Sequence, residues 1–411
     1  MPFAIYVLGL AVFAQATSEF MLSGLIPDIA AEMHVSLSAA GALTSAFAVG
    51  MIVGAPLMAV LSLRWPRRRA LLVFLTAFVV VHVIGAVTAD FPVLLATRVV
   101  GALANAGFLA VGLTAAAGMV APDAKGRATS VLLTGTTLAC VAGVPAGAVL
   151  GQAYGWRAAF WAVALICLPA VLAVLRSVPD TTPAATPAAT PAATPAATYG
   201  GVRPSARREL RALRRPRLLV VLLVAALVNA ATFCAFTYLA PVVTEVGGFS
   251  EGWVPVMLAL FGLGAFAGVT VGGRLSDTRP MWVLLPGGIA SLAGWGLFAA
   301  TAGSPAAVFV LVLVQGTLSF AVGSTLIARV MYAAPDAPSL AGSFATAAFN
   351  VGAAAGPAAG GLALAAGLGF RSPLWVSALL VAAALVTAGL AWAVRPLRRG
   401  KPVDGRVSGG L

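Results

Sequence analysis

The chain has 411 residues, of which 61% are hydrophobic and 9% charged, whereas a soluble domain carries about 25% charged residues. This composition excludes an ordinary water-soluble protein, because so few charged side chains do not cover its surface. The net charge is +13, but the basic residues lie in short clusters between apolar segments. That pattern indicates membrane topology and argues against nucleic-acid binding.

Apolar segments of about 20 residues, long enough to cross a bilayer as helices, recur along the whole chain. Those of the first half lie near residues 4–26, 38–63, 70–88, 93–118, 129–151 and 158–176. Those of the second half lie near 217–242, 252–275, 281–301, 305–330, 340–366 and 373–394. The sequence therefore predicts an all-α membrane protein with twelve transmembrane helices in two six-helix halves.

A proline-rich segment separates the halves. Residues 183–198 repeat Pro-Ala-Ala-Thr four times, and proline at this spacing prevents a packed core. We therefore expect an N-terminal six-helix half, a cytoplasmic Pro/Ala/Thr-rich and basic linker, a C-terminal six-helix half and a basic cytoplasmic tail, at residues 1–178, 179–216, 217–394 and 395–411.

The placement of arginine and lysine predicts the orientation. If both termini are cytoplasmic, only Arg157 and Arg371 among the basic residues fall on outer loops. The excess of arginine over lysine, with abundant alanine and glycine, is associated with GC-rich bacterial genomes. We expect a multi-pass protein of a bacterial cell membrane, for which a monomer suffices.

The two halves resemble each other in sequence. Four residues recur after 212 to 215 positions, namely Pro27 as Pro241, Ser62 as Ser276, Gly101 as Gly316 and Pro145 as Pro357. This spacing predicts two halves in parallel repeat, the architecture of a transporter whose substrate site lies between the halves.

Neither an internal ATP-driven motor nor an enzyme is indicated. The sequence contains no phosphate-binding loop of the form G-x-x-x-x-G-K-[ST], so the energy comes from an ion or substrate gradient or from a separate subunit. The cysteines form no C-x-x-C pair, and His34 and His82 lie in separate segments. We expect no metal, no cofactor and no catalytic centre.

Two charged residues lie well inside apolar segments, Glu19 in the first helix and Arg98 in the fourth. Each costs about 2.5–3.5 kcal/mol near the bilayer centre, so such residues persist where they pair or line a cavity. Burial and Arg98 act on Glu19 in opposite directions, and we expect Glu19 to bind and release a proton while Arg98 keeps its charge. The alternative is a purely structural pair between the two helices.

Polar residues inside the helices are candidate substrate contacts. Gln15 shares a helix face with Glu19, and Asn105 shares one with Arg98. In the second half the candidates, with helix–helix hydrogen bonds as the alternative, are Asn229, Gln315 and Asn350. Phe233 holds the position that corresponds to Glu19, so proton coupling is expected in the first half alone.

The fifth helix is rich in glycine and proline. Gly143, Gly147 and Gly151 permit close helix packing, and Pro145 removes an internal hydrogen bond. A close-packed helix that bends suits a moving interface between the halves, and static tight packing is the alternative.

These segments resemble the major facilitator superfamily, and within it the twelve-helix branch of drug–proton antiporters. The similar segments are residues 17–20 with 24–27 in the first helix, 94–101 in the fourth and 143–151 in the fifth. The resemblance implies that Arg98 takes part in proton coupling. It also implies that the fifth helix supports export and limits leak.

The loop motif of that family, G-x-L-a-D-r-x-G-r-[KR], is incomplete in the first half. Leu63 replaces an aspartate that forms an interhelical latch in the family, although Arg64 follows it. The second half keeps Arg274 and Asp277. The resemblance implies a role in conformational change for Arg64, Arg274 and Asp277, with an altered latch beside Leu63.

More narrowly, residues 1–161 resemble the chloramphenicol-resistance exporters of actinomycetes. This resemblance implies export of a small amphiphilic drug, chloramphenicol, in exchange for protons, and hence antibiotic resistance. An exporter of sugars or other small metabolites is one alternative, against which the sparse polarity of the helices argues. A membrane sensor or scaffold is another, for which the sequence offers no soluble signalling domain.

Overall fold

The structure is a computed structural model that describes residues 2–62, 65–121, 124–178, 211–276, 280–334 and 340–393. Within these ranges every regular element is a helix. Twelve of the described helices are long and apolar enough to cross a membrane. The predicted fold class is confirmed.

The helices of the first half follow the predicted order. They are α1 (Phe3–Phe20), the 3₁₀ turn η1 (Met21–Gly24), α2 (Ile26–Glu32), α3 (Leu37–Ser62), α4 (Arg67–Val87), α5 (Phe91–Gly118), α6 (Lys125–Leu138), the π-helical turn η3 (Ala139–Gly143), α7 (Val144–Tyr154) and α8 (Arg157–Ser177). The predicted fifth helix thus consists of α6, η3 and α7, because Pro145 in the first turn of α7 interrupts the regular hydrogen bonding.

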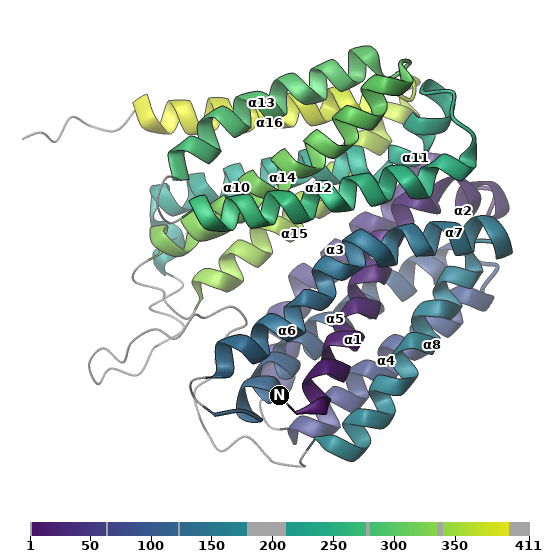
Figure 1. The fold of residues 1–411 in the computed structure, drawn as a ribbon, viewed down its shortest axis with the longest axis vertical. Helices are drawn as coiled ribbons and strands as arrows, with labels where there is room; N and C mark the ends of the chain where they lie inside the picture. The colour runs from purple at the N-terminus through teal and green to yellow at the C-terminus, as the bar shows by residue number, and fades with distance from the viewer. Residues whose placement is uncertain are drawn as a thin grey trace, which may run out of the picture.

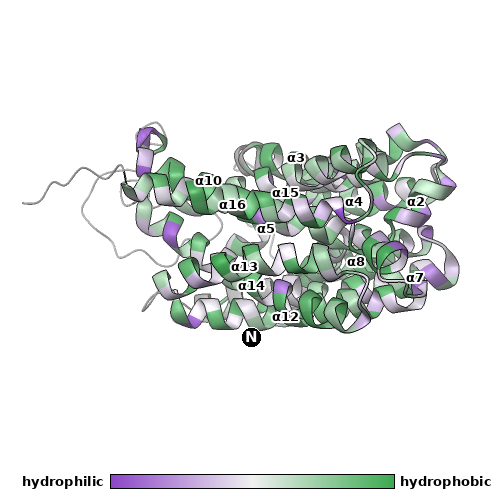
Figure 2. Ribbon diagram, turned by 90° about the horizontal axis from the view of Figure 1, so that it is seen from above, coloured by the Kyte–Doolittle hydropathy of each residue, from purple (hydrophilic) through white to green (hydrophobic). Residues whose placement is uncertain are grey.

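The second half repeats this order. Its elements are η4 (Arg211–Arg214), α10 (Pro216–Thr237), α11 (Leu239–Pro241), the π-helical turn η5 (Val242–Val246), η6 (Glu251–Trp253), α12 (Val254–Leu275), α13 (Pro280–Thr301), α14 (Pro305–Ala333), α15 (Ala341–Ala365) and α16 (Ser372–Ala393). Figure 1 shows the two halves as separate bundles, and Figure 2 shows hydrophilic residues gathered near the helix ends.

Small residues set the helix packing in the same way in both halves. In the first, Gly135 and Gly143 bring the fifth helix against the backbone or side chains of α1. In the second, Gly352 and Gly356 bring α15 against the backbone of α10. The equivalent helices of the two halves are thus paired alike, as a parallel repeat requires.

The halves meet at the end of the molecule that contains α2, α7 and α11, which we name the closed end. There Gln152 donates to the Glu251 carbonyl at 2.6 Å, and Gly41 leaves room for the buried Tyr238. Toward the other end the two bundles diverge in Figure 1. The Ser45 hydroxyl, which donates to the Ala354 carbonyl at 2.7 Å, joins α3 to α15 across the interface.

Three acidic side chains also lie at the closed end, Asp28 and Glu32 on α2 and Glu251 on η6. Partial burial, followed by the charges of Glu251 and Glu32, raises the pKa of Asp28 above its ordinary 3.8. The folded protein then holds this proton more tightly than the unfolded chain, so stability falls as pH rises from about that ordinary value through the raised one.

We therefore expect Asp28→Asn to raise the melting temperature at neutral pH and to remove part of its fall between acidic and neutral pH. The measurement is thermal unfolding of detergent-solubilised protein at a series of pH values. Glu245→Gln, which removes an exposed carboxylate of the same charge, is the control. An identical pH dependence for Asp28→Asn and the wild type contradicts the prediction.

Candidate functional site

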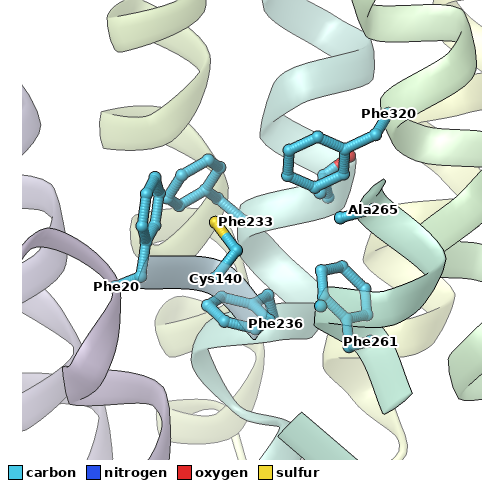
Figure 3. Close-up of a pocket in the computed structure, with 9 residues that line it drawn as sticks. Phe20, Cys140, Phe233, Phe236, Phe261, Ala265 and Phe320 are labelled. Atoms are coloured by element: carbon cyan, nitrogen blue, oxygen red, sulfur yellow. The ribbon is translucent and has the colours of Figure 1, made fainter. Parts of the chain in front are cut away.

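A narrow aromatic cavity lies between the two halves. The first half contributes Phe20 from the end of α1 and Cys140 from η3, and Figure 3 shows both facing rings of the second half. The lining residues of the second half are Thr232, Phe233, Phe236, Phe261, Gly262, Ala265 and Phe320. Such a lining suits an apolar or aromatic guest.

The rings of this cavity form a continuous series across the interface. The ring centroids of Phe20 and Phe233 are 5.8 Å apart, and those of Phe233 and Phe236 are 6.5 Å apart. Phe236 then lies 4.8 Å from Phe261, which lies 6.3 Å from Phe320. These separations fall in the range of favourable aromatic pairs, so a planar guest finds ring faces and edges on several sides.

This cavity is not predictable from the sequence. Phe233 and Phe236 are three positions apart on α10 and so share a helix face. Phenylalanine is common in every apolar helix, however, and nothing in this chain marks these rings as different. The one available signal was the sequence repeat, in which Phe233 holds the position equivalent to Glu19.

Arg98 is buried and binds the end of α1. One guanidinium nitrogen, Nη1, donates to the Ser18 hydroxyl at 2.9 Å, and Nη2 donates to the Ser18 carbonyl at 2.7 Å. Since α1 ends at Phe20, the Ser18 carbonyl belongs to the last turn, whose carbonyls lack regular helical partners. The cation also faces the negative end of the helix dipole, and its carbon lies 4.6 Å from the Phe47 ring centroid.

His82 extends this hydrogen-bonded series. Its Nε2 lies 2.6 Å from the Ser18 hydroxyl oxygen, and its Nδ1 lies 2.7 Å from the Phe78 carbonyl. Both Ser18 and His82 are buried. Sequence reasoning set His82 aside as a residue in a separate segment, because no local pattern connects α4 with α1 and α5.

Glu19 lies between Ser18 and the cavity residue Phe20 in the chain. Its carboxyl group is within electrostatic range of both Arg98 and Cys140. Among the described residues, however, the hydrogen bonds of Arg98 go to Ser18, and no ion pair joins Arg98 to Glu19. The structure thus brings the two predicted residues together in space, and their role in proton coupling stays a prediction.

The other predicted polar residues of the first half are buried. Neither side-chain atom of Gln15 that can form hydrogen bonds has a partner among the described residues. Asn105 donates to the Met51 sulfur at 3.6 Å, which joins α5 to α3. Neither residue lines the aromatic cavity.

Each of the three predicted residues of the second half forms a hydrogen bond to a backbone carbonyl. Asn229 donates to Phe349 at 2.6 Å and Gln315 to Ser291 at 3.1 Å, so both connect neighbouring helices. Asn350 donates to Thr346 within α15 at 3.0 Å. Gln315 also lies beside a second, tightly packed aromatic site, which shares Phe236 and Phe261 with the first.

The glycines of the predicted fifth helix face α1 within the same half. Gly143, Gly147 and Gly151 pack against Thr17, Met21 and Leu25, so both series advance by four residues. The two sides of this helix differ, since Val144 and Ala148 belong to the apolar core of the second half. The helix therefore connects the broken end of α1 with α12.

The remaining predictions fall partly outside the described residues. Arg64 and Asp277 lie outside them, whereas Arg274 is exposed in the last turn of α12. In the part of the chain that the structure describes, no group of three or more His, Cys, Asp or Glu residues could hold a metal ion.

The protein consists of two similar six-helix bundles with a cavity at their interface. This arrangement places it in the class of membrane transport proteins. The comparisons with known proteins give the family. Residues 8–341 match the Major Facilitator Superfamily, and the chain belongs to it.

Curated relatives match nearly the whole chain. The chain is 57% identical to the chloramphenicol resistance protein of Streptomyces lividans, over 94% of this chain and 96% of that protein. It is 35% identical to the inner membrane transport protein YdhP of Escherichia coli K12, over 92% of this chain and 93% of that protein.

Solved structures show the same fold. A bacterial homologue of the human lysosomal transporter Spinster, in an inward-facing and occupied conformation, has a TM-score of 0.73 and 16% identity over 95% of this chain and 96% of that chain. The inward-facing and unoccupied conformation gives 0.68 and 17% over 95% and 94%.

The contact between α1 and the fifth helix yields a prediction for stability. A methyl group on Gly143 would overlap the Thr17 side chain, whereas one on Gly147 would lie 3.3 Å from the Met21 Cβ. We expect Gly143→Ala to destabilise the protein by about 1–3 kcal/mol, as overpacking does, and Gly147→Ala to cost less.

The measurement is a double-mutant cycle on purified protein, read as melting temperature. Thr17→Ala together with Gly143→Ala should recover much of the loss, because the overlapping atoms are removed. Additive losses in the double variant would show that the contact with Thr17 does not set the glycine requirement.

Proposed function

We propose that this protein exports small amphiphilic drugs, chloramphenicol foremost, in exchange for protons. The observation that carries the proposal is the aromatic cavity, which is lined by Phe20, the residue after Glu19, and by Cys140, which lies within electrostatic range of Glu19. The likeness to the chloramphenicol resistance protein of Streptomyces lividans supports the choice of drug.

The chemistry of the cavity fits such a drug better than a sugar. Chloramphenicol carries a nitrophenyl ring, which can stack among Phe20, Phe233 and Phe236. Of the lining side chains only Thr232 and Cys140 are polar or weakly polar, and the Thr232 hydroxyl already donates to the Val228 carbonyl at 3.1 Å. A sugar would leave most of its hydroxyls without partners. The hydroxyl and amide groups of chloramphenicol are few enough to remain at the edge near Glu19.

In this mechanism Glu19 binds a proton when the cavity opens to the outside and releases it when the cavity opens to the inside. Drug and proton compete because the drug occupies a cavity lined by Phe20 and Cys140, and Cys140 lies within electrostatic range of Glu19. Inward movement of one proton supplies about 2.3 kcal/mol per 100 mV of membrane potential. Arg98 biases Glu19 electrostatically and keeps its own proton.

The proposed setting is the inner membrane of a bacterium, with both termini in the cytoplasm and a monomer as the working unit. In that orientation the closed end faces outward, and the end at which the bundles diverge faces the cytoplasm, from which a drug would enter.

The first test follows labelled chloramphenicol in drug-sensitive bacteria that express the protein, with and without a protonophore. We expect low accumulation that rises when the protonophore collapses the gradient. Glu19→Gln, which removes the titrating proton, should abolish export at equal membrane levels, whereas Glu245→Gln should not. Unchanged accumulation in expressing cells would refute the drug assignment, and export that resists the protonophore would refute proton coupling.

A second test addresses the cavity. Phe20→Ala removes a cavity ring against which the drug ring would stack, and the loss of one such aromatic pair weakens binding by about two- to tenfold. We expect the KM for chloramphenicol transport in inverted membrane vesicles to rise by that factor. Phe3→Ala, on the exposed start of the same helix, is the matched control, and an equal effect of both changes would place the drug elsewhere.

A further inference from the structure

The hydrogen-bond series from Phe78 to Arg98 has a defined direction. A carbonyl oxygen only accepts, so Nδ1 of His82 carries a hydrogen and donates to Phe78 at 2.7 Å. A second positive charge beside the buried guanidinium of Arg98 is unfavourable, so the imidazole is neutral and its Nε2 accepts from the Ser18 hydroxyl. The lone pairs of that hydroxyl are then free to accept from Arg98.

The imidazole itself is held in place by its surroundings. The rings of Phe78 and Phe160 lie 4.1 Å and 5.8 Å from it. Among the described residues, the titratable or charged groups around this series are Glu19 on α1, His82 on α4, Arg98 on α5 and Cys140 on η3. The facing residue of α3 is Phe47, which covers the guanidinium.

Resting on the proposed function, we infer that His82 is a positioning residue for the proton-coupling pair Glu19 and Arg98. It acts through Ser18: it keeps Arg98 bound to the end of α1 and prevents Arg98 from pairing with Glu19. Without an acceptor at position 82, the Ser18 hydroxyl turns to a carbonyl one turn back on its own helix. Its lone pairs then leave Nη1 of Arg98, which is free to pair with the neighbouring carboxylate, while Nη2 keeps its bond to the Ser18 carbonyl. That pairing favours the ionised form of Glu19.

Two near-isosteric substitutions separate this role from simple packing. In His82→Asn the amide nitrogen replaces Nδ1 and still reaches Phe78, but nothing reaches Ser18. In His82→Gln the longer side chain replaces Nε2, and its carbonyl accepts from Ser18. Ser18→Ala removes the middle of the series, and His34→Asn changes the other histidine at a position with φ of 53°, which asparagine tolerates.

The experiment is infrared spectroscopy of purified, drug-free protein over a series of pH values. The carbonyl stretching band of the protonated Glu19 carboxyl group is assigned by its disappearance in Glu19→Gln. In His82→Asn and Ser18→Ala we expect the pH at which this band is half lost to fall by about one unit. One unit, a tenfold change, is the low end of the ~1–3 units by which a newly paired arginine shifts a carboxyl group toward its ionised form. In His82→Gln and His34→Asn the midpoint should equal that of the wild type.

An unchanged midpoint in His82→Asn would overturn the inference, as would an equal shift in His82→Asn and His82→Gln. The readout requires no drug, so it separates this inference from the substrate assignment. Chloramphenicol binding to the same samples, measured by equilibrium dialysis, tests the substrate. If the infrared midpoints are as expected but chloramphenicol does not bind, the positioning role of His82 stands and the choice of chloramphenicol as substrate is refuted.

Discussion

A guanidinium inside an apolar helix bundle must find its acceptors within the protein, and this requirement organises the first half of the molecule. Arg98 finds them at Ser18, where α1 stops being a regular α-helix. The break that frees the Ser18 carbonyl also turns Phe20 toward the second half, where it lines the cavity. The buried charge, the end of the helix and the position of the cavity are therefore one structural feature.

Small residues allow that feature to connect with the rest of the fold. Gly143 and Gly147 let the fifth helix lie directly against the last turn of α1 and the 3₁₀ turn that follows it. On the adjoining face of this helix, Ala148 packs in the core of the second half. A displacement at the end of α1 thus meets a stiff, closely packed neighbour that already contacts α12, because close packing leaves little room for independent movement.

The architecture could be predicted because it depends on patterns that the bilayer imposes, namely apolar segments of spanning length and a repeat between halves. Glu19 and Arg98 were also predictable, since a charge in an apolar segment is conspicuous in any sequence. The cavity and the role of His82 were not, because they depend on which helices become neighbours. In the sequence Phe233 is one apolar residue among many, and His82 is an isolated histidine. Only the folded structure shows that Phe233 contacts Phe20 of α1 and that His82 lies beside Ser18.

The repeat also accounts for how the proposed exchange of drug and proton uses few polar residues. At equivalent positions of the two halves stand Glu19 and Phe233, a carboxyl group and an aromatic ring. The first half holds the charges and their hydrogen bonds, whereas the second supplies most of the rings. Phe20 connects the two, since its ring contacts Phe233 and its backbone neighbour is Glu19. In the proposed mechanism a ligand in the cavity meets Phe20 and Cys140, and Cys140 lies within electrostatic range of Glu19. The proposed competition between drug and proton therefore needs no signal across the molecule.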